Sequence, residues 1–353
     1  MSSYETSTRL AELWTATDRL LEGATLEDVV VHHLGPLAAT RLRRRGAPVP
    51  EPLVREERAA ALSMLTGIPL VQRVRESCDG PLVLIKGPEI ARLYPDNARR
   101  FGDIDLLTAT ADAVHRSLLA NGFLEVDDPD LALHPEHHHL HPLRWPSIWL
   151  KVEVHTAPNW PLRAPRAPLE EILEARIPSS LGVEGVCAPT PLHHALVLAA
   201  HAWRHEPLQA LRDLLDVAVV SAPVPERELE RTADAWGIGR LWRTTWHAIE
   251  AVIYGGPRTV PLRTWARHLT SVRERSVLER HLQLLLHAYW ELPPHLASAQ
   301  AARALGRALG PTPGETWRAK LTRARSAVRN PRAPVTGRDS RLRLRSRRGR
   351  PGD

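Results

Sequence analysis

A short apolar run and the turn after it mark the first structural unit of the chain. Residues 82–85 are apolar at every position, which favours a strand buried on both faces, although a run of this length also suits a buried helix. Gly87 and Pro88 predict a turn into a short helix, because Pro88 suits the first helical position, and Pro95 ends that helix. Amides at a helix start favour anions, so Lys86 and Gly87 are candidate phosphate-binding residues.

The segment that follows alternates polar and apolar positions with a period of two. In residues 103–107, Asp103 and Asp105 share one face, while Ile104 and Leu106 point into the core. Two carboxylates side by side on a strand repel each other unless a cation lies between them. Carboxylate oxygens at this spacing suit Mg²⁺, although a plain surface strand produces the same pattern.

A second alternating segment carries a third acid. In residues 149–155 the apolar positions are 150, 152 and 154, so Glu153 and His155 lie on the opposite face. Glu153 joins Asp103 and Asp105 if the two strands are neighbours. Three such carboxylates can hold two metal ions for in-line phosphoryl transfer.

Helical patterns flank this region on both sides. Residues 4–78 predict N-terminal helices that cap the sheet, residues 111–121 a helix ended by Gly122, and residues 190–310 a helical domain. Four apolar positions at helical spacing form the expected buried face of the second N-terminal pattern: Ala59, Leu62, Leu65 and Val71.

Composition narrows the class of protein. A chain of 353 residues holds one large or two modest domains. Its two cysteines, Cys78 and Cys187, lack the C-x-x-C spacing of a zinc site and give no disulfide framework. The chain begins without a secretory pattern, and no apolar run approaches the ~18 residues of a membrane span. We therefore expect a cytoplasmic protein without membrane partners.

The positive charge is concentrated at the C-terminal end. Residues 316–353 contain thirteen Lys and Arg against two acids, an excess of eleven, so residues 1–315 carry −4 of the overall +7. Few large apolar side chains accompany this charge, and we expect a disordered basic tail over residues 311–353. Any nucleic-acid contact would be made through the tail rather than through a basic folded domain.

Histidines are the other conspicuous feature. Residues 134–141 contain five of them, which suits either a transition-metal site or a strand over residues 137–143 that pairs with residues 149–155. His201 and His205 are four apart on one helix face, and they either face the catalytic cleft or pack within the helical domain. Neither pattern matches the H-E-x-x-H motif of zinc peptidases.

Several short motifs together resemble the bacterial "uncharacterised nucleotidyltransferase" family within the DNA-polymerase-β-like superfamily. The matching segments are residues 85–87, 93–95, 100–107, 121–123 and 152–155, and the likeness is clearest over residues 82–160. The superfamily usually has Gly-Gly or Gly-Ser at the turn, whereas this chain has Gly87-Pro88. The change removes one amide and one hydroxyl from the expected phosphate cradle, for which Lys86 can compensate as a point charge.

The resemblance implies transfer of a nucleoside monophosphate from an NTP, with ATP as the first choice, to a hydroxyl or phosphate of an acceptor. The acceptor classes it leaves open are a small molecule, a peptide and a protein. It implies two Mg²⁺ ions, with Mn²⁺ as a substitute. The residues it assigns are Asp103, Asp105 and Glu153 as metal ligands and catalytic groups, Lys86, Gly87 and Arg100 as nucleotide contacts, and His155, His201 and His205 as substrate contacts.

We therefore predict an α/β (α+β) protein with a small mixed sheet of the nucleotidyltransferase type. Its expected parts are an N-terminal helical cap (1–80), a catalytic core (81–160), a connector (161–189), a helical domain (190–310) and the basic tail (311–353). Two alternatives stay open: a catalytically silent nucleotide- or partner-binding relative, and a nucleic-acid-interacting protein that acts through the tail.

Overall fold

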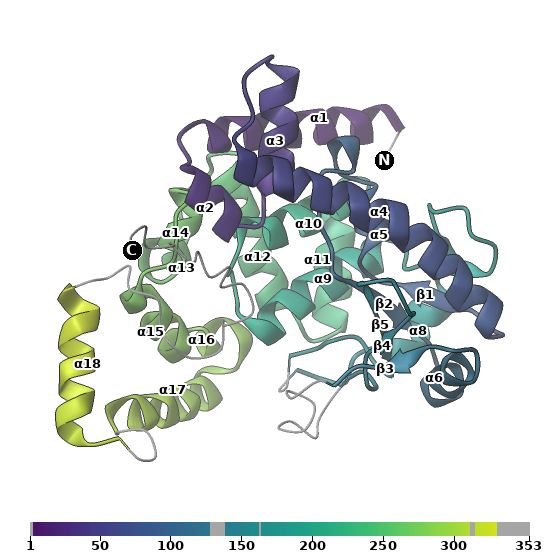
Figure 1. The fold of residues 1–353 in the computed structure, drawn as a ribbon. Helices are drawn as coiled ribbons and strands as arrows, with labels where there is room; N and C mark the ends of the chain where they lie inside the picture. The colour runs from purple at the N-terminus through teal and green to yellow at the C-terminus, as the bar shows by residue number, and fades with distance from the viewer. Residues whose placement is uncertain (1–2, 128–137, 162–163, 311–314, 330–353) are drawn as a thin grey trace, which may run out of the picture.

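The computed structural model describes residues 3–127, 138–161, 164–310 and 315–329, and among these is a seven-stranded mixed sheet, whose labelled strands lie toward the right in Figure 1. The strand order is β3-β4-β5-β2-β1-β7-β6. The strands are β1 (Leu82–Leu84), β2 (Asp103–Leu107), β3 (Leu124–Glu125), β4 (Leu143–Arg144), β5 (Lys151–His155), β6 (Ile177–Pro178) and β7 (Val186–Ala188). The predicted α/β class with a mixed sheet is confirmed.

The two strands with alternating polarity are neighbours at the middle of the sheet. β2 runs parallel to β5, and Asp105 lies directly opposite Glu153. On its other side β2 pairs antiparallel with β1, which in turn runs parallel to β7. The fully apolar β1 is therefore an interior strand, as its sequence predicts.

One face of the sheet is covered by α4 (Glu51–Ser77) and α6 (Ala111–Ala120). The side chains that form this layer include Leu70 and Val74 of α4, Leu118 of α6, and Ile104 and Val152 of the strands. The predicted inward orientation of Ile104 and Leu106 is confirmed, because both are fully buried in this layer. The polar positions of β2 and β5 must then face the other side.

The opposite face of the sheet packs against the C-terminal helices. Leu107 of β2 and Val83 of β1 share a hydrophobic core with α9 and α10. The helices of this part are α9 (Pro191–His205), α10 (Leu211–Ser221), α11 (Glu226–Ala235), α12 (Gly239–Ile253), α13 (Val260–Thr264), α14 (Arg267–Thr270), α15 (Val277–Leu286), α16 (Ala288–Glu291) and α17 (Pro294–Leu309). The polar side chains of β2 and β5 are thus on the face of the sheet that a helical layer covers.

The first three helices, α1 (Ser3–Glu22), α2 (Leu26–Val31) and α3 (Gly35–Arg44), contribute to the same core as the C-terminal helices. His32, which directly follows α2, connects these N-terminal helices to the C-terminal helical layer. Its Nε2 donates to the Arg273 carbonyl at 3.0 Å, its Nδ1 accepts from the Leu211 amide at 3.1 Å, and its ring stacks on that of His268 in α14. Figure 1 shows α2 beside α14. Of the helices described up to residue 80, α4 packs on the buried face of Ile104 and Val152, while α1 to α3 extend the C-terminal helical layer.

Residues 161–189, which we expected as a connector, contain α8 (Leu169–Glu174) and the strands β6 and β7. Because β7 pairs with β1, this segment completes the sheet beyond the expected core. In the expected tail, α18 (Trp317–Arg329) is helical, and residues 330–353 lie outside the described part of the chain. None of the helices described is both long enough and apolar enough to cross a membrane.

Candidate active site

Four polar side chains from β2 and β5 meet on the face of the sheet that the helical layer covers. Asp103 and Asp105 come from β2, and Glu153 and His155 from β5, with Asp105 opposite Glu153 in the parallel register. Asp103 and Asp105 are two residues apart on β2, and Glu153 and His155 are two residues apart on β5. Because side chains alternate between the two faces of a strand, the members of each pair share a face. The parallel pairing of β2 with β5 then brings the two pairs to the same side of the sheet. The structure thus brings together the three acids that the sequence singles out.

The closest contacts in this group involve His155. Its Nε2 lies 2.9 Å from Asp105 Oδ1 and 3.9 Å from Glu153 Oε2, and the ligand atoms of these three residues all lie within 4.8 Å of one another. His155 is 1% exposed and Asp105 3% exposed, while the Glu153 side chain is partly exposed. The group is therefore compact and nearly dry, with Glu153 on its more open side.

Burial and mutual charge separate the pKa values of the three carboxyls. Burial, followed by the charges of Asp105 and Asp103, raises the pKa of Glu153 to about 8. Burial also raises the pKa of Asp103, and the charge of Asp105 adds to this. For Asp105 burial acts in the same direction, but the hydrogen bond and charge of His155 outweigh it and lower the pKa to about 2. Crowded carboxyls with separated pKa values are typical of a functional site, and a bound cation would lower all three pKa values.

The residues of this group fit a divalent cation. Asp105 Oδ2 is buried and has no hydrogen-bond partner among the described residues, whereas Oδ1 accepts from His155. An unpaired buried carboxylate oxygen is costly, and a metal ion would satisfy it. Two carboxylates and an imidazole within 4.8 Å of one another provide a suitable set of donor atoms.

Lys86 and Gly87 lie at the turn between β1 and α5 (Pro88–Ala91), close to the acids. Lys86 Nζ contacts Nε2 of His201 on α9. Burial lowers the pKa of Lys86, and the charges of Asp105 and Asp103 oppose this. Gly87 has φ of 67°, and a Cβ atom there would lie 2.8 Å from the Asp103 carbonyl oxygen, so the turn packs directly on the start of β2. His201 therefore joins the site through Lys86.

The two arginines before β2 form ion pairs with different helices. Arg100, expected as a nucleotide contact, pairs with Glu56 of α4 at 3.0 Å. Its neighbour Arg99 is buried and makes two hydrogen bonds of 2.7 Å to Asp216 of α10, which also accepts from the Tyr94 hydroxyl at 2.7 Å. Sequence reasoning missed this group, since no local signal distinguishes Arg99 from Arg100.

The histidine-rich segment is only partly described, because residues 134–137 lie outside the described chain. The predicted strand over residues 137–143 is wrong in extent, since β4 begins at Leu143. Its predicted pairing with residues 149–155 is confirmed, because β4 runs antiparallel to β5, a bridge joins His139 to His155, and the Leu140 amide donates to the Val154 carbonyl at 2.9 Å. The rings of His138 and His139 nevertheless lie 5.1 and 5.4 Å from the His155 ring. Part of the cluster therefore packs against the site. The side chain of His205, at the end of α9, lies outside what the structure describes.

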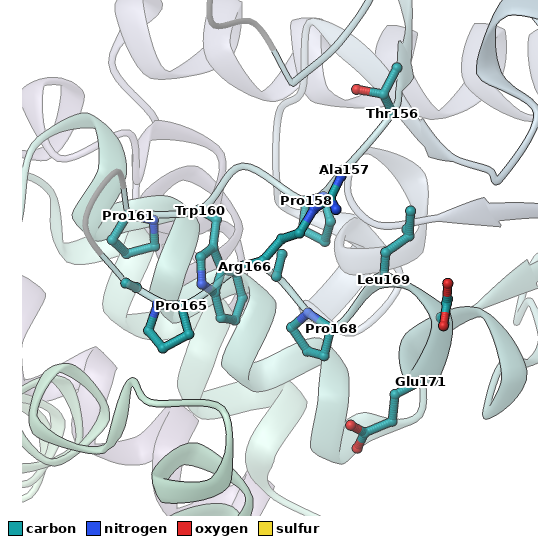
Figure 2. A pocket seen from close by; sticks show the side chains of 13 residues that line it. Thr156, Ala157, Pro158, Trp160, Pro161, Pro165, Arg166, Pro168, Leu169 and Glu171 are labelled. Atoms are coloured by element: carbon teal, nitrogen blue, oxygen red, sulfur yellow. The ribbon is translucent and has the colours of Figure 1, made fainter.

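A cavity of about 660 Å³ begins where β5 ends. Thr156 and Ala157 belong to its wall and directly follow His155 in sequence. Figure 2 shows Trp160, Arg166 and Glu171 around it, together with several prolines. None of the three acids lines the cavity, so the cavity does not contain the carboxylate group.

Comparison with known proteins identifies a family. Residues 24–252 match the family described as "Uncharacterised nucleotidyltransferase". No curated protein and no solved structure matches the chain. The matched range runs from the N-terminal helices through the sheet to α12, and it includes all the acids of the site. The family match and the mixed α/β fold agree, and the chain belongs to the uncharacterised nucleotidyltransferase family.

Proposed function

We propose that this protein transfers a nucleoside monophosphate from an NTP to a hydroxyl or phosphate of an acceptor and releases diphosphate. Membership of a nucleotidyltransferase family supports a transferase. The observation that carries the proposal is the parallel pairing of β2 with β5, which places Asp105 opposite Glu153 and leaves Asp105 Oδ2 buried and unpaired. Such a carboxylate group is suited to binding the cations of an NTP.

In this proposal Asp103 and Asp105 would hold two divalent cations, and Glu153 would hold the one nearer the acceptor. When bound, the cations supply charge stabilisation for the attacking and leaving oxygens. Mg²⁺ is the ion that we would supply first in an assay of this reaction, with Mn²⁺ as the alternative. The nearly dry setting of Asp105 strengthens electrostatic interactions at this point.

The acceptor oxygen forms a new bond to the α-phosphorus, and the bond from that phosphorus to the bridging oxygen of the β-phosphate breaks. Diphosphate leaves with the electron pair, and the acceptor proton passes to the carboxylate of Glu153. Lys86 and the Gly87 turn would steady the phosphates. His201 would orient Lys86, with which it is in contact.

The acceptor would lie between the sheet and the helical layer. The cavity after β5 starts three residues beyond Glu153, a span of about 10 Å along a strand. Its prolines, Trp160 and polar groups suit a small hydroxylated molecule or a peptide segment. ATP is the NTP that we would test first.

The proposal is tested with Mg²⁺, each α-labelled NTP and a cell extract as the source of acceptor. The wild type should transfer label, and the Asp103→Asn/Asp105→Asn variant should lose this activity. Asp112→Ala is the matched control, because Asp112 is an exposed acid at the start of α6. Transfer that survives in the double variant would overturn the assignment of the acids.

The Gly87-Pro88 departure favours one rival, a relative that binds NTP without turnover. That rival takes precedence if the wild type binds NTP with Mg²⁺ but yields neither transferred label nor diphosphate. A protein acting through its tail would instead bind nucleic acid with a steep salt dependence, and the acids would not affect this binding.

A further inference from the structure

His155 occupies an unusual position for a histidine on a β-strand. It is 1% exposed, and its Nε2 lies near both an Asp105 oxygen and a Glu153 oxygen. The function proposed above assigns the cations to carboxylates alone. Imidazole nitrogen, however, is a ligand that first-row transition ions accept more readily than Mg²⁺, which prefers oxygen.

The three donor atoms lie close enough together for one ion to reach all of them, since they are all within 4.8 Å of one another. With metal–ligand bonds of ~2.1 Å, adjacent ligands of an octahedral ion are about 3 Å apart and opposite ligands about 4.2 Å. Nε2 of His155 lies 2.9 Å from Asp105 Oδ1 and 3.9 Å from Glu153 Oε2. The shorter contact is a hydrogen bond that Nε2 donates to Asp105, so coordination by Nε2 requires the neutral ring to carry its proton on Nδ1 instead. Nδ1 is buried and has no hydrogen-bond partner among the described residues, so no existing contact holds the ring in the other tautomer.

The surroundings also hold the His155 ring in place. Its backbone is fixed by the β2–β5 pairing and by the bridge to His139, and the Thr156 amide donates to the His138 carbonyl at 2.8 Å. The rings of His138 and His139 pack beside it. A side chain restrained on several sides is suited to coordination, because little ordering remains to be done on binding.

We propose that His155 is a direct nitrogen ligand of a mixed nitrogen–oxygen metal centre with Asp105 and Glu153, and that this centre binds Mn²⁺ in preference to Mg²⁺. The inference deepens the proposed function, because it concerns the same site. It can fail while that function stands, since an all-oxygen centre would still support nucleotidyl transfer.

The first test uses the wild-type protein and Mn²⁺ alone. Pulsed electron paramagnetic resonance detects the coupling of a directly bound nitrogen, and preparing the protein with ¹⁵N-histidine changes that coupling if the nitrogen is a histidine's. We expect a histidine coupling that disappears in His155→Asn. Absence of the coupling in the wild type, or its persistence in His155→Asn, would overturn the proposal.

The second test measures the affinity for Mn²⁺ and Mg²⁺ by calorimetry without NTP. His155→Asn should weaken Mn²⁺ binding about tenfold or more and Mg²⁺ binding much less, which reduces the preference between the ions. His115→Asn is the matched control, because His115 is a buried histidine of α6, which packs on the other face of the sheet, and should leave both affinities unchanged.

Equal weakening of both ions in His155→Asn would show that His155 only orients Asp105, and the proposal would be wrong. Since neither measurement needs an acceptor or an NTP, failure here is distinguishable from failure of the proposed transfer reaction. If the wild-type protein shows the histidine coupling but transfers no label, the result counts against the transfer reaction and leaves the metal centre standing.

Discussion

At the scale of single residues, the site depends on one close approach between a turn and a strand. Gly87 has a positive φ, and its Cα faces the carbonyl of Asp103 with no room for a side chain. The turn that carries Lys86 is thereby held against the strand that carries the acids. A side chain at position 87 would therefore push the turn away from the strand.

Gly87→Ala should therefore cost about 1–3 kcal/mol of unfolding free energy through crowding, in addition to backbone strain. Urea unfolding measures this cost. Gly255→Ala is the matched control, since Gly255 has φ of 73° and nothing within 4 Å of an added Cβ. Equal destabilisation by the two substitutions would show that the contact with Asp103 has no energetic weight.

At the scale of elements, the sheet and the helical layer are connected by a buried ion pair. Arg99 lies in the loop before β2, and Asp216 lies on α10. Both are 5% exposed, and the Tyr94 hydroxyl adds a third hydrogen bond. Burial opposes ionisation of Asp216, but the charge of Arg99 outweighs it and lowers the pKa of that carboxyl.

Asp216→Asn should destabilise the protein by about 3–5 kcal/mol, because it leaves the Arg99 guanidinium buried without its counter-charge. Asp213→Asn is the control. Asp213 belongs to the same helix but is more exposed and pairs loosely with Arg212 at 3.7 Å, so its loss should cost less than about 1 kcal/mol. Similar unfolding free energies for the two variants would contradict this account of the buried pair.

The element α4 shows where periodicity misleads. We expected Leu62 and Leu65 on its buried face, but they are 50% and 72% exposed, and the residues that face the sheet include Ser63, Gly67 and Leu70. A Cβ at Gly67 would lie 2.9 Å from the Phe101 ring, so the helix approaches too closely for larger side chains there. Helical spacing predicted the helix, but the close packing determined which face is buried.

At the scale of the whole molecule, buried histidines join the N-terminal helices to the C-terminal helices. His32, after α2, stacks on His268 of α14, whose Nε2 donates to the Gln209 carbonyl at 3.0 Å. Burial, followed by the positive charge of Arg275, lowers the pKa of His268 to about 3. The histidine is therefore neutral in the folded protein over most of the acidic range.

This depressed pKa makes stability depend on pH. The unfolded histidine takes up its proton near pH 6.5, so its contribution to stability is complete above that pH and is lost as the pH falls toward 3. The loss should be at most about 1.4 kcal/mol per pH unit. Unfolding free energies of His268→Gln between pH 6.5 and 4 should fall less steeply than those of the wild type. The exposed His247→Gln should leave the slope unchanged, and an unchanged slope in His268→Gln would refute the prediction.

The sequence by itself determined the mixed α/β class, the central apolar strand and the common face of Asp103 and Asp105, because these follow from local periodicity. Local patterns carry no information on which distant segments approach each other. Only the tertiary structure placed His201 at Lys86 and joined Arg99 rather than Arg100 to Asp216. Only the strand order brought His155 within hydrogen-bonding distance of Asp105, because contacts between strands 50 residues apart depend on how the chain packs as a whole.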